Sequence, residues 1–384
     1  MFPYLYTALL VVAFGLLWPV ALLMSFLPKY RRSIPARFFL YKNPLFEGID
    51  IHFHSCSLGE TKALAPLIER FDRKGISVIT QTGYEAAKAY KGAQVRYLPY
   101  EPWLWGWLRP VKALVVMEAE LWYLLFFLAK KRGAATFLVN ARISDRSYPK
   151  YRRFAWLYKR VFANIDHVYA QSEEDKKRLE ALGAKNVEVT GNIKLLSRPV
   201  VAKKYDKVRP LIVAASTHDP EEEIVATDWV MTQMGKSTLA VVPRHPERFD
   251  EVDELLRHIA EREGLRYHRL SQKEDLHADI VLVDQMGELI NLYAIADLVI
   301  LGGSFIDGIG GHNPIEAAYF GAPIISGPHY HNQQQTYSYV EGIAVVEANA
   351  LQEALQGPWQ PTKITGRVTI EPIVERIENV VRNG

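Results

Sequence analysis

Residues 298–316 read LVILGGSFIDGIGGHNPIE, an apolar run, a glycine-rich segment and the start of a helix. The run 298–301 predicts a buried strand, and Asn313, Pro314 and Glu316 fit the N-cap, N1 and N3 positions of the helix that follows. Glycines before a helix N-terminus, such as Gly311, let backbone N–H groups approach an anion. The stretch therefore predicts a phosphate-binding turn in an α/β domain, with a plain glycine-rich connection as the alternative. Its spacing supports neither nucleoside triphosphate hydrolysis nor hydride transfer.

On both sides of this stretch, short apolar runs alternate with helical segments, which predicts parallel sheets built from βαβ units. The first series of expected strands covers residues 49–54, 76–81, 95–99, 113–117, 136–139, 167–170 and 187–190. The second covers residues 211–215, 239–242, 280–283, 298–301, 323–325 and 344–346. We therefore expect α/β domains at 29–195 and 211–384, a linker at 196–210 and a cleft between the two halves. The last helix could pack back on the N-terminal domain.

Residues 1–28 contain no charged side chain, and about 20 apolar residues suffice for a helix to cross a bilayer. The cationic residues follow the apolar run instead of preceding it, which argues against a cleaved signal peptide. We expect an uncleaved membrane anchor with the rest of the chain on the cytoplasmic side. The alternative is a helix that lies in the membrane interface without spanning it.

Composition excludes several classes of protein. The chain has 384 residues, which favours two domains, and one cysteine, which excludes an intramolecular disulfide and a cysteine-rich zinc module. A net charge of +3 is far from that of a dedicated nucleic-acid binder. No Asp-x-Asp motif and no His/Cys cluster with ligand spacing occurs, so the sequence predicts no metal site.

The end of the first expected strand carries a candidate general base. Ser57 and Glu60 fit a capping box, in which both side chains satisfy N–H groups of a helix running towards Lys74. A carboxylate at such a turn is also placed to accept a proton from a sugar hydroxyl. His52 and His54 share one face of the strand, and we expect both to be structural.

A second pair of carboxylates, Glu118 and Glu120, follows the buried run 113–117. Extended geometry would place both on one face, where like charge raises one pKa. Lys194 closes the first half and Arg244 follows the strand at 239–242, and both could meet a phosphate. After the strand at 280–283, Met286, Gly287 and Glu288 form a further loop that could meet a nucleoside.

Residues 142–160 are rich in cations and aromatic rings. Such a run suits an anionic membrane or a phosphorylated glycolipid, whereas the alternative is an ordinary solvated face. The cations are Arg142, Arg146, Lys150, Arg152, Arg153, Lys159 and Arg160.

Taken in order, these segments resemble the Kdo (3-deoxy-D-manno-octulosonic acid) transferases of lipopolysaccharide assembly. The resemblance begins at the N-terminal anchor and covers most of the chain. The segments that carry it are Ser57-Leu-Gly-Glu60, Glu120-Leu-Trp122, Asn140-Ala-Arg142, Gly191-Asn-Ile-Lys194, Ala215-Ser-Thr-His218, Pro243-Arg-His245, Gly311-His-Asn-Pro-Ile-Glu316, Gly327-Pro-His329 and Asn332. Tyr123 and Ala317 stand where proline is common in the family.

The resemblance implies a glycosyltransferase B fold, in which two Rossmann-like domains face each other across a cleft. It also implies transfer of Kdo from CMP-Kdo to the 6′-hydroxyl of a lipid A precursor at the inner membrane, with inversion and without a metal or other cofactor. By the same resemblance, Glu60 is the general base and Glu120 a second essential carboxylate. The residues it assigns to the donor are Lys194, Arg244, Met286, Gly287, Glu288, Gly311, Asn313 and Glu316. The alternatives are a lipid-directed transferase that uses a UDP-sugar and an inactive membrane-anchored scaffold.

Overall fold

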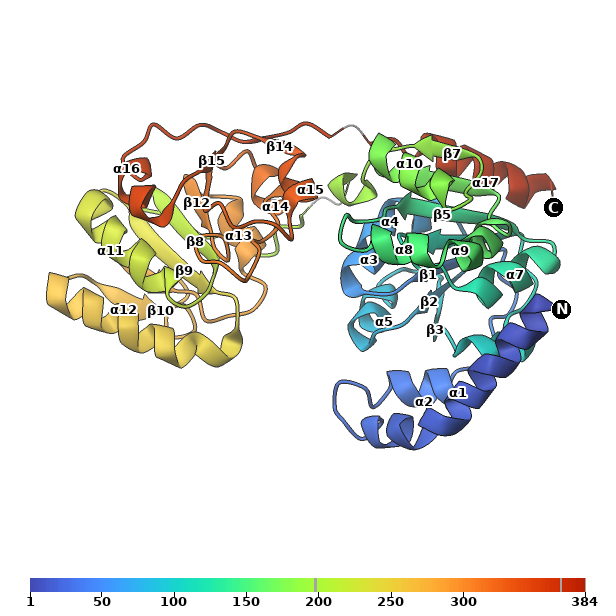
Figure 1. The fold of residues 1–384 in the computed structure, drawn as a ribbon. Coiled ribbons are helices and arrows are strands. Elements are labelled where there is room, and N and C mark those ends of the chain that lie inside the picture. Colours follow the sequence, from blue (N-terminus) through green and yellow to red (C-terminus); the bar gives the residue numbers. More distant parts are fainter. Residues whose placement is uncertain (197–198, 367, 384) are drawn as a thin grey trace. The chain divides into compact units, whose positions relative to one another are not determined.

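A computed structural model describes residues 1–196, 199–366 and 368–383 (Figure 1). The chain forms two compact units, Met1–Ser197 with Arg367–Gly384, and Arg198–Gly366. Each unit is built on a seven-stranded sheet whose neighbouring strands are all parallel. The central strands are buried on both faces, which is why their sequences are continuous apolar runs without alternation.

The sheet of unit 1 has the order β3-β2-β1-β4-β5-β6-β7. The chain enters at β1, moves outward to β3 and then returns beside β1 to form β4. Ligands of open parallel sheets bind at such a reversal, at the carboxyl ends of the strands. The strands are β1 (Ile51–Ser55), β2 (Lys74–Val78), β3 (Gln94–Tyr97), β4 (Ala113–Met117), β5 (Ala135–Ala141), β6 (His167–Ala170) and β7 (Val187–Val189).

Helices cover both faces of this sheet (Figure 1). The expected helix from Ser57 towards Lys74 ends early and is replaced by two short ones, because Pro66 lacks the N–H needed to continue the first. The helices of unit 1 beyond the first are α2 (Ser33–Phe38), α3 (Leu58–Ala63), α4 (Ala65–Ile68), α5 (Gln81–Ala87), α6 (Leu104–Trp107), α7 (Tyr123–Lys131), α8 (Tyr148–Arg153), α9 (Ala155–Phe162), α10 (Glu173–Ala181) and the C-terminal α17 (Glu371–Asn383).

Helix α17 packs on unit 1 although it ends the chain. Its buried side chains Ile373, Val374 and Ile377 join the same apolar cluster as Phe53 of β1. Lys112 Nζ also donates to the carbonyl oxygen of Val381 at 2.7 Å. The second domain, expected at 211–384, therefore ends before α17, which belongs to unit 1.

Unit 2 repeats the arrangement with the order β10-β11-β9-β8-β12-β13-β15, so its reversal lies between β8 and β12. The strands are β8 (Leu211–Thr217), β9 (Thr238–Pro243), β10 (Tyr267–Arg269), β11 (Ile280–Leu282), β12 (Leu298–Leu301), β13 (Ile324–Ser326) and β15 (Ile343–Val345), with a separate pair β14 (Val340–Glu341) and β16 (Lys363–Ile364). The helices are α11 (Glu221–Gln233), α12 (Phe249–Glu263), α13 (Leu289–Tyr293), α14 (Ile315–Ala318), α15 (Gln334–Tyr337) and α16 (Leu351–Ala354). Strands β10, β14 and β16 were not expected, because each is short and only partly buried.

Most of the expected linker belongs to unit 2, and its residues 197 and 198 lie outside the described chain. Tyr205 is buried and donates to Glu288 Oε2 at 2.9 Å. The N–H groups of Ala202 and Lys203 donate to Asn291 Oδ1. The segment therefore packs as an extended strap on its own domain.

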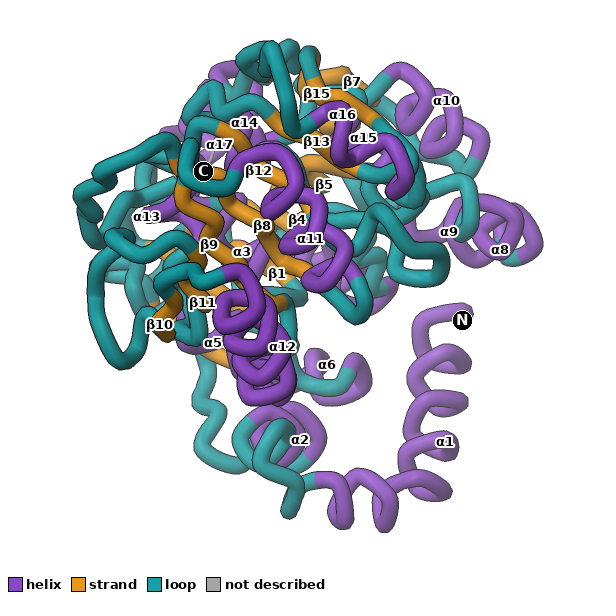
Figure 2. Tube along the Cα trace, turned by 90° about the vertical axis from the view of Figure 1, so that its left-hand side faces the viewer, coloured by secondary structure: helices purple, strands orange, loops and turns teal. Residues whose placement is uncertain are grey.

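Helix α1 (Phe2–Met24) lies outside the layers of unit 1 and leads into α2 (Figure 2). It has 23 residues, none of them buried, and is long and apolar enough to cross a membrane by length and composition. Polar contacts nevertheless attach it to the domain. Tyr6 Oη donates to Glu101 Oε2 at 2.7 Å, and Tyr100 Oη donates to the carbonyl oxygen of Leu10 at 2.8 Å.

Candidate functional site

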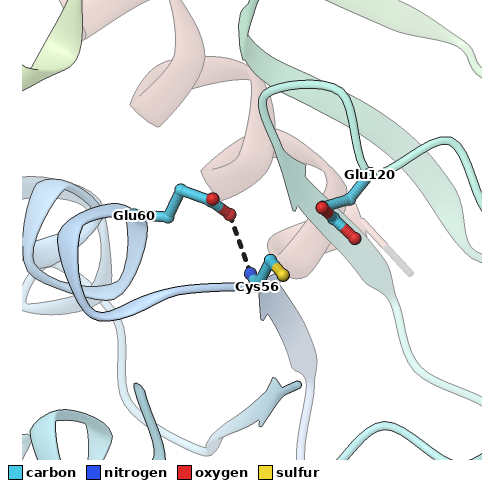
Figure 3. Close-up of side chains that lie close together, drawn as sticks. All are labelled: Cys56, Glu60 and Glu120. Atoms are coloured by element: carbon cyan, nitrogen blue, oxygen red, sulfur yellow. Dashed lines mark hydrogen bonds between the residues drawn. The ribbon is translucent and has the colours of Figure 1, made fainter. Parts of the chain in front are cut away.

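Two turns at the reversal point of the unit 1 sheet bring Glu60 and Glu120 together. Glu60 follows β1 and Glu120 follows β4, and these neighbouring strands run parallel in register, His54 opposite Val116. Figure 3 shows both carboxylates on either side of Cys56. The two glutamates are far apart in sequence, and they lie close together only because β1 and β4 are neighbours in the sheet.

The N-cap predicted at Ser57 is confirmed, but the reciprocal bond of the capping box is made to the N–H of the preceding residue. Ser57 is the N-cap of α3, and its hydroxyl accepts from the Glu60 N–H at 3.4 Å and donates to Glu60 Oε1 at 2.9 Å. Glu60 Oε2 in turn accepts from the N–H of Cys56 at 2.7 Å. Capping thus holds the carboxylate in place while leaving it half-buried at the strand end.

The pKa values of the two carboxyl groups are shifted in opposite directions. Burial raises the pKa of Glu60, and the charges of Glu118 and Glu120 add to that effect, although hydrogen bonds from Cys56 and Ser57 oppose it. Burial also acts on Glu120, but the nearby His54, Trp122 and Cys56 side chains stabilise its ionised form and lower its pKa. A pair of carboxyl groups with separated pKa values is the usual setting for distinct acid–base roles.

His54 is structural, as expected, but it also faces this site. Its Nδ1 lies 2.8 Å from Ser77 Oγ, and its Nε2 lies 3.9 Å from Glu120 Oε2. Trp122 Nε1 donates to the same oxygen of Glu120 at 2.7 Å. These two rings orient Glu120 towards the turn that holds Glu60.

The expectation that Glu118 and Glu120 share one face is wrong. Glu118 has a φ of 55°, so the chain leaves the extended conformation directly after β4 and turns. Glu118 Oε1 instead pairs with Lys194 Nζ at 2.5 Å, and Asn140 Nδ2 lies 3.4 Å from the same oxygen. Lys194 is therefore held within unit 1, where it neutralises Glu118.

A thiol and the two carboxylates form a group that sequence spacing did not reveal. One ligand atom each from Cys56, Glu60 and Glu120 lies within 4.8 Å of the others, close enough to hold a metal ion. Burial, together with the charges of Glu120 and Glu60, raises the pKa of the Cys56 thiol to about 12. A metal ion binds the thiolate, so metal binding at this group would have to release the proton of Cys56.

Unit 2 contains a cavity of about 240 Å³ at the carboxyl ends of its strands, and most of the expected donor residues line it. Arg244 is exposed and forms no ion pair with the described residues. Burial raises the pKa of Tyr293 in the cavity wall, and the charge of Glu316 adds to this effect. The expected residues in the lining are Arg244, Met286, Gly287, Asn313 and Glu316.

Glu288 and Gly311 do not line this cavity in the described structure. Glu288 Oε2 accepts from Tyr205 Oη and from Asn291 Nδ2. Gly311 has a φ of 80° and approaches Tyr330 so closely that a Cβ atom would lie 2.8 Å from the Tyr330 Cβ. The structure therefore does not place these two expected donor residues in the cavity wall.

The prediction that residues 302–304 bind a phosphate is wrong. A carboxylate of the chain itself accepts the hydrogen bonds of the N–H groups at this turn. Glu221 is 1% exposed and accepts from the N–H groups of Gly303, Ser304 and Phe305 and from that of His218. Helix α14 has only four residues, so its end adds little dipole. Sequence reasoning missed Glu221, which lies at the start of α11 far from the glycines it binds.

A histidine pair was also missed as a feature of the site. His218 Nε2 lies 2.9 Å from His312 Nε2, and the ring of His245 lies 5.3 Å from that of His218. Burial, with the neighbouring His218 and Arg244, lowers the pKa of His312 to about 4. His312 is therefore neutral at pH 7, and its contact with His218 forms part of one wall of the cavity, since His312 lines it.

The basic run forms α8 and α9 on the surface of unit 1. Its exposed cations Arg146, Arg152, Arg153 and Lys159 form no ion pair with the described residues, whereas Arg142 is half-buried. Phe154 and Trp156 are 49% and 53% exposed beside them. The ring of Trp156 lies 6.1 Å from that of Phe2, so this surface adjoins the start of α1.

Known proteins resemble the chain over nearly its whole length. The profile of a family described as 3-deoxy-D-manno-octulosonic-acid transferase (kdotransferase) matches residues 32–197. A 3-deoxy-D-manno-octulosonic acid transferase of Haemophilus influenzae is 33% identical, with 93% of this chain and 89% of that protein covered. The chain belongs to the 3-deoxy-D-manno-octulosonic acid (Kdo) transferases. The corresponding enzyme of Chlamydophila psittaci is 31% identical over 86% of this chain and 82% of its own length.

A solved structure agrees with the fold of this Kdo transferase. A candidate UDP-N-acetylglucosamine 2-epimerase of Listeria monocytogenes superimposes with a TM-score of 0.51 at 11% identity, covering 88% of this chain and 89% of the other. The two parallel-sheet units are those of the glycosyltransferase B fold. As a member of its family, the protein is a glycosyltransferase that acts in lipopolysaccharide biosynthesis.

Proposed function

We propose that this Kdo transferase moves Kdo from CMP-Kdo to the 6′-hydroxyl of a lipid A precursor with inversion. The observation that carries the proposal is the pair Glu60 and Glu120 at the reversal point of the unit 1 sheet. Glu60 has a raised pKa and a fixed carboxylate, as a general base near neutral pH requires.

In this mechanism the acceptor hydroxyl gives its proton to Glu60 while its oxygen attacks the anomeric carbon of Kdo. The bond from that carbon to the phosphate oxygen of CMP breaks, and CMP leaves with the electron pair. Attack from the side opposite CMP inverts the configuration. Glu120 stays ionised and supports the positive charge that develops on the sugar.

The cavity of unit 2 suits the nucleotide half of the donor. Arg244 offers two N–H groups to a phosphate, and Asn313 and Glu316 offer polar atoms to a ribose or base. CMP carries a single phosphate, so a guanidinium can stabilise its leaving charge without a metal ion. Lys194 remains a candidate second cation, which would have to exchange Glu118 for the phosphate.

The membrane side of the proposal rests on α1 and on the surface of α8 and α9. Helix α1 presents large exposed apolar side chains such as Leu9, Leu16 and Leu23. Its contacts with Glu101 and Tyr100 hold it along the domain, which favours a helix lying in the interface at the cytoplasmic face of the inner membrane. Exposed cations beside it would attract anionic headgroups.

The decisive experiment is the product mass after incubation of the purified protein with CMP-Kdo and a lipid A precursor. A mass increase of one or more Kdo residues is expected, with CMP released in equal amount. CMP, but not UDP, should raise the melting temperature. Protection by UDP indicates a UDP-sugar donor, and absence of any product indicates the inactive scaffold.

Metal independence is tested separately. We expect EDTA to leave the initial rate unchanged, since a guanidinium can stabilise the charge of the leaving CMP without a metal ion. A rate that falls with EDTA and returns with Mg²⁺ or Zn²⁺ contradicts the metal-free mechanism.

A further inference from the structure

Unit 1 contains a second, larger cavity that the proposed chemistry does not use. It has a volume of about 770 Å³, within the range of about 300–1,000 Å³ typical of small-molecule sites. One wall is the C-terminal half of α1, and the opposite walls are α2 and the turn that precedes α5. The α1 wall is wholly apolar and consists of Ala13, Phe14, Leu17, Val20, Ala21 and Met24.

Two cations lie in the lining of this apolar cavity. Lys29 follows α1, and Arg37 belongs to α2. Arg37 is half-buried, and its Nε donates to the carbonyl oxygen of Leu98 at 3.0 Å. Arg37 forms no direct ion pair with the described residues; the charge of Glu120 acts on its guanidinium, but no carboxylate oxygen contacts it. An anionic group in the cavity would supply a direct partner.

The polar end of the cavity is joined to the turn that carries Glu60. Thr80 lines the cavity, and both its N–H and its hydroxyl donate to the carbonyl oxygen of Cys56, at 3.2 and 3.1 Å. The N–H of Cys56 donates in turn to Glu60 Oε2 at 2.7 Å. Gln81, the next lining residue, has a buried Oε1 without a hydrogen-bond partner in the described structure. A hydroxyl of a bound molecule would satisfy it.

These observations specify an elongated molecule with an apolar tail and an anionic head. The tail has to reach the cavity from the exposed apolar face of α1, which is the face suited to a membrane. A soluble apolar ligand would leave the two cations without a partner, and a soluble anion would leave the α1 wall uncovered. A phosphorylated lipid meets both requirements.

We propose that this cavity holds an acyl chain of the glycolipid acceptor, with a phosphate of the same molecule at Arg37. The inference rests on the proposed function, since it names how that acceptor is held. It assigns to α1 a direct part in substrate binding in addition to membrane attachment. The acyl chain would then fix the sugar hydroxyl beside Glu60, because Arg37 and Thr80 connect the two places.

The test fills the cavity and compares two acceptors. Ala21→Phe puts a ring into the apolar wall, and Ala8→Phe, on the same helix but exposed and outside the lining, is the matched control. Each is assayed with the acylated acceptor and with the same phosphorylated disaccharide freed of its acyl chains. The ring occupies the space of at least about two methylene groups, so Ala21→Phe should raise KM for the acylated acceptor at least about tenfold. KM for the deacylated acceptor and for CMP-Kdo should not change, and Ala8→Phe should match the wild type.

Arg37→Gln tests the anionic head. It should raise KM at least about tenfold for both phosphorylated acceptors, because the charge-assisted contact is lost with or without acyl chains. Equal KM values for the acylated acceptor in Ala21→Phe and the wild type, with normal melting temperatures, overturn the inference. A wild type that transfers Kdo to neither acceptor refutes the proposed function instead.

A measurement on the unaltered protein covers the case in which Ala21→Phe does not fold. An acceptor carrying a diazirine in the middle of one acyl chain is photolysed with the wild type in detergent, and the labelled peptides are identified by mass spectrometry. Labels within residues 13–38 or 79–82 support the inference. Labels confined to other parts of the chain refute it.

Discussion

Replacing Glu60 with glutamine separates the two roles that the structure combines in this side chain. The amide oxygen of glutamine can still accept from the Cys56 N–H, now at 2.7 Å from Oε2, and the amide group can still meet Ser57 Oγ. The cap should therefore survive, with a loss of stability below about 1 kcal/mol. The proton acceptor is lost, so turnover should fall by about 10²–10⁴.

Ser57→Ala is the matched control, because it removes the cap and keeps the carboxylate. Loss of an N-cap costs about 1 kcal/mol, which should lower the melting temperature while turnover stays within about tenfold of the wild type. Both variants are assayed by CMP release at saturating acceptor, and donor binding is followed by thermal protection with CMP. A Glu60→Gln protein that melts normally, binds CMP and keeps a near-wild-type rate would show that Glu60 is only a cap.

Four further predictions test other parts of the structure. Arg244→Gln should raise KM for CMP-Kdo about 10–100-fold without changing acceptor KM, since one charge-assisted contact is worth about 1.5–3 kcal/mol; an unchanged donor KM removes this residue from the donor site. The rate should fall as pH drops through the raised pKa of Glu60, because the general base becomes protonated. The charge of Glu118 helps to raise that pKa, so Glu118→Gln should move the acid limb of the kcat/KM profile to lower pH. A shift to higher pH contradicts the assignment of Glu60 as the base. Tyr6→Phe leaves the buried carboxylate of Glu101 without one donor, so the melting temperature in detergent should fall by the equivalent of about 1–3 kcal/mol, and equal melting would mean that α1 is not attached there. Neutralising three exposed cations together should weaken sedimentation with anionic vesicles by about 1 kcal/mol per charge and raise acceptor KM alone, an effect that high salt should mimic in the wild type and that is absent if the face is merely solvated. These cations are Arg152, Arg153 and Lys159.

Local chemistry alone determined several features of this Kdo transferase. The apolar runs at 113–117, 167–170 and 298–301 are strands with the expected bounds, because strands buried on both faces need continuous apolar sequence. The N-cap at Ser57 was predictable because its hydrogen bond joins residues three positions apart. The absence of charged residues at 1–28 likewise predicted an apolar helix, since length and hydropathy suffice to identify one.

The site itself was decided by the tertiary structure. Glu60 and Glu120 meet only because β1 and β4 are neighbours, and strand order is a long-range property that no local pattern encodes. The turn that begins at Gly302 and Gly303 does bind an anion, but that anion is the carboxylate of Glu221 from another element, held by the N–H groups of residues 303–305. The sequence suggested that the last helix packs back on unit 1, but it did not identify the side chains of β1 and β2, some 300 residues away in sequence, that contact the apolar face of α17. Residue type and spacing therefore determine which polar groups a turn presents. Packing between distant elements determines which of these groups stay available to a substrate, because a polar group that becomes buried forms its hydrogen bonds within the fold.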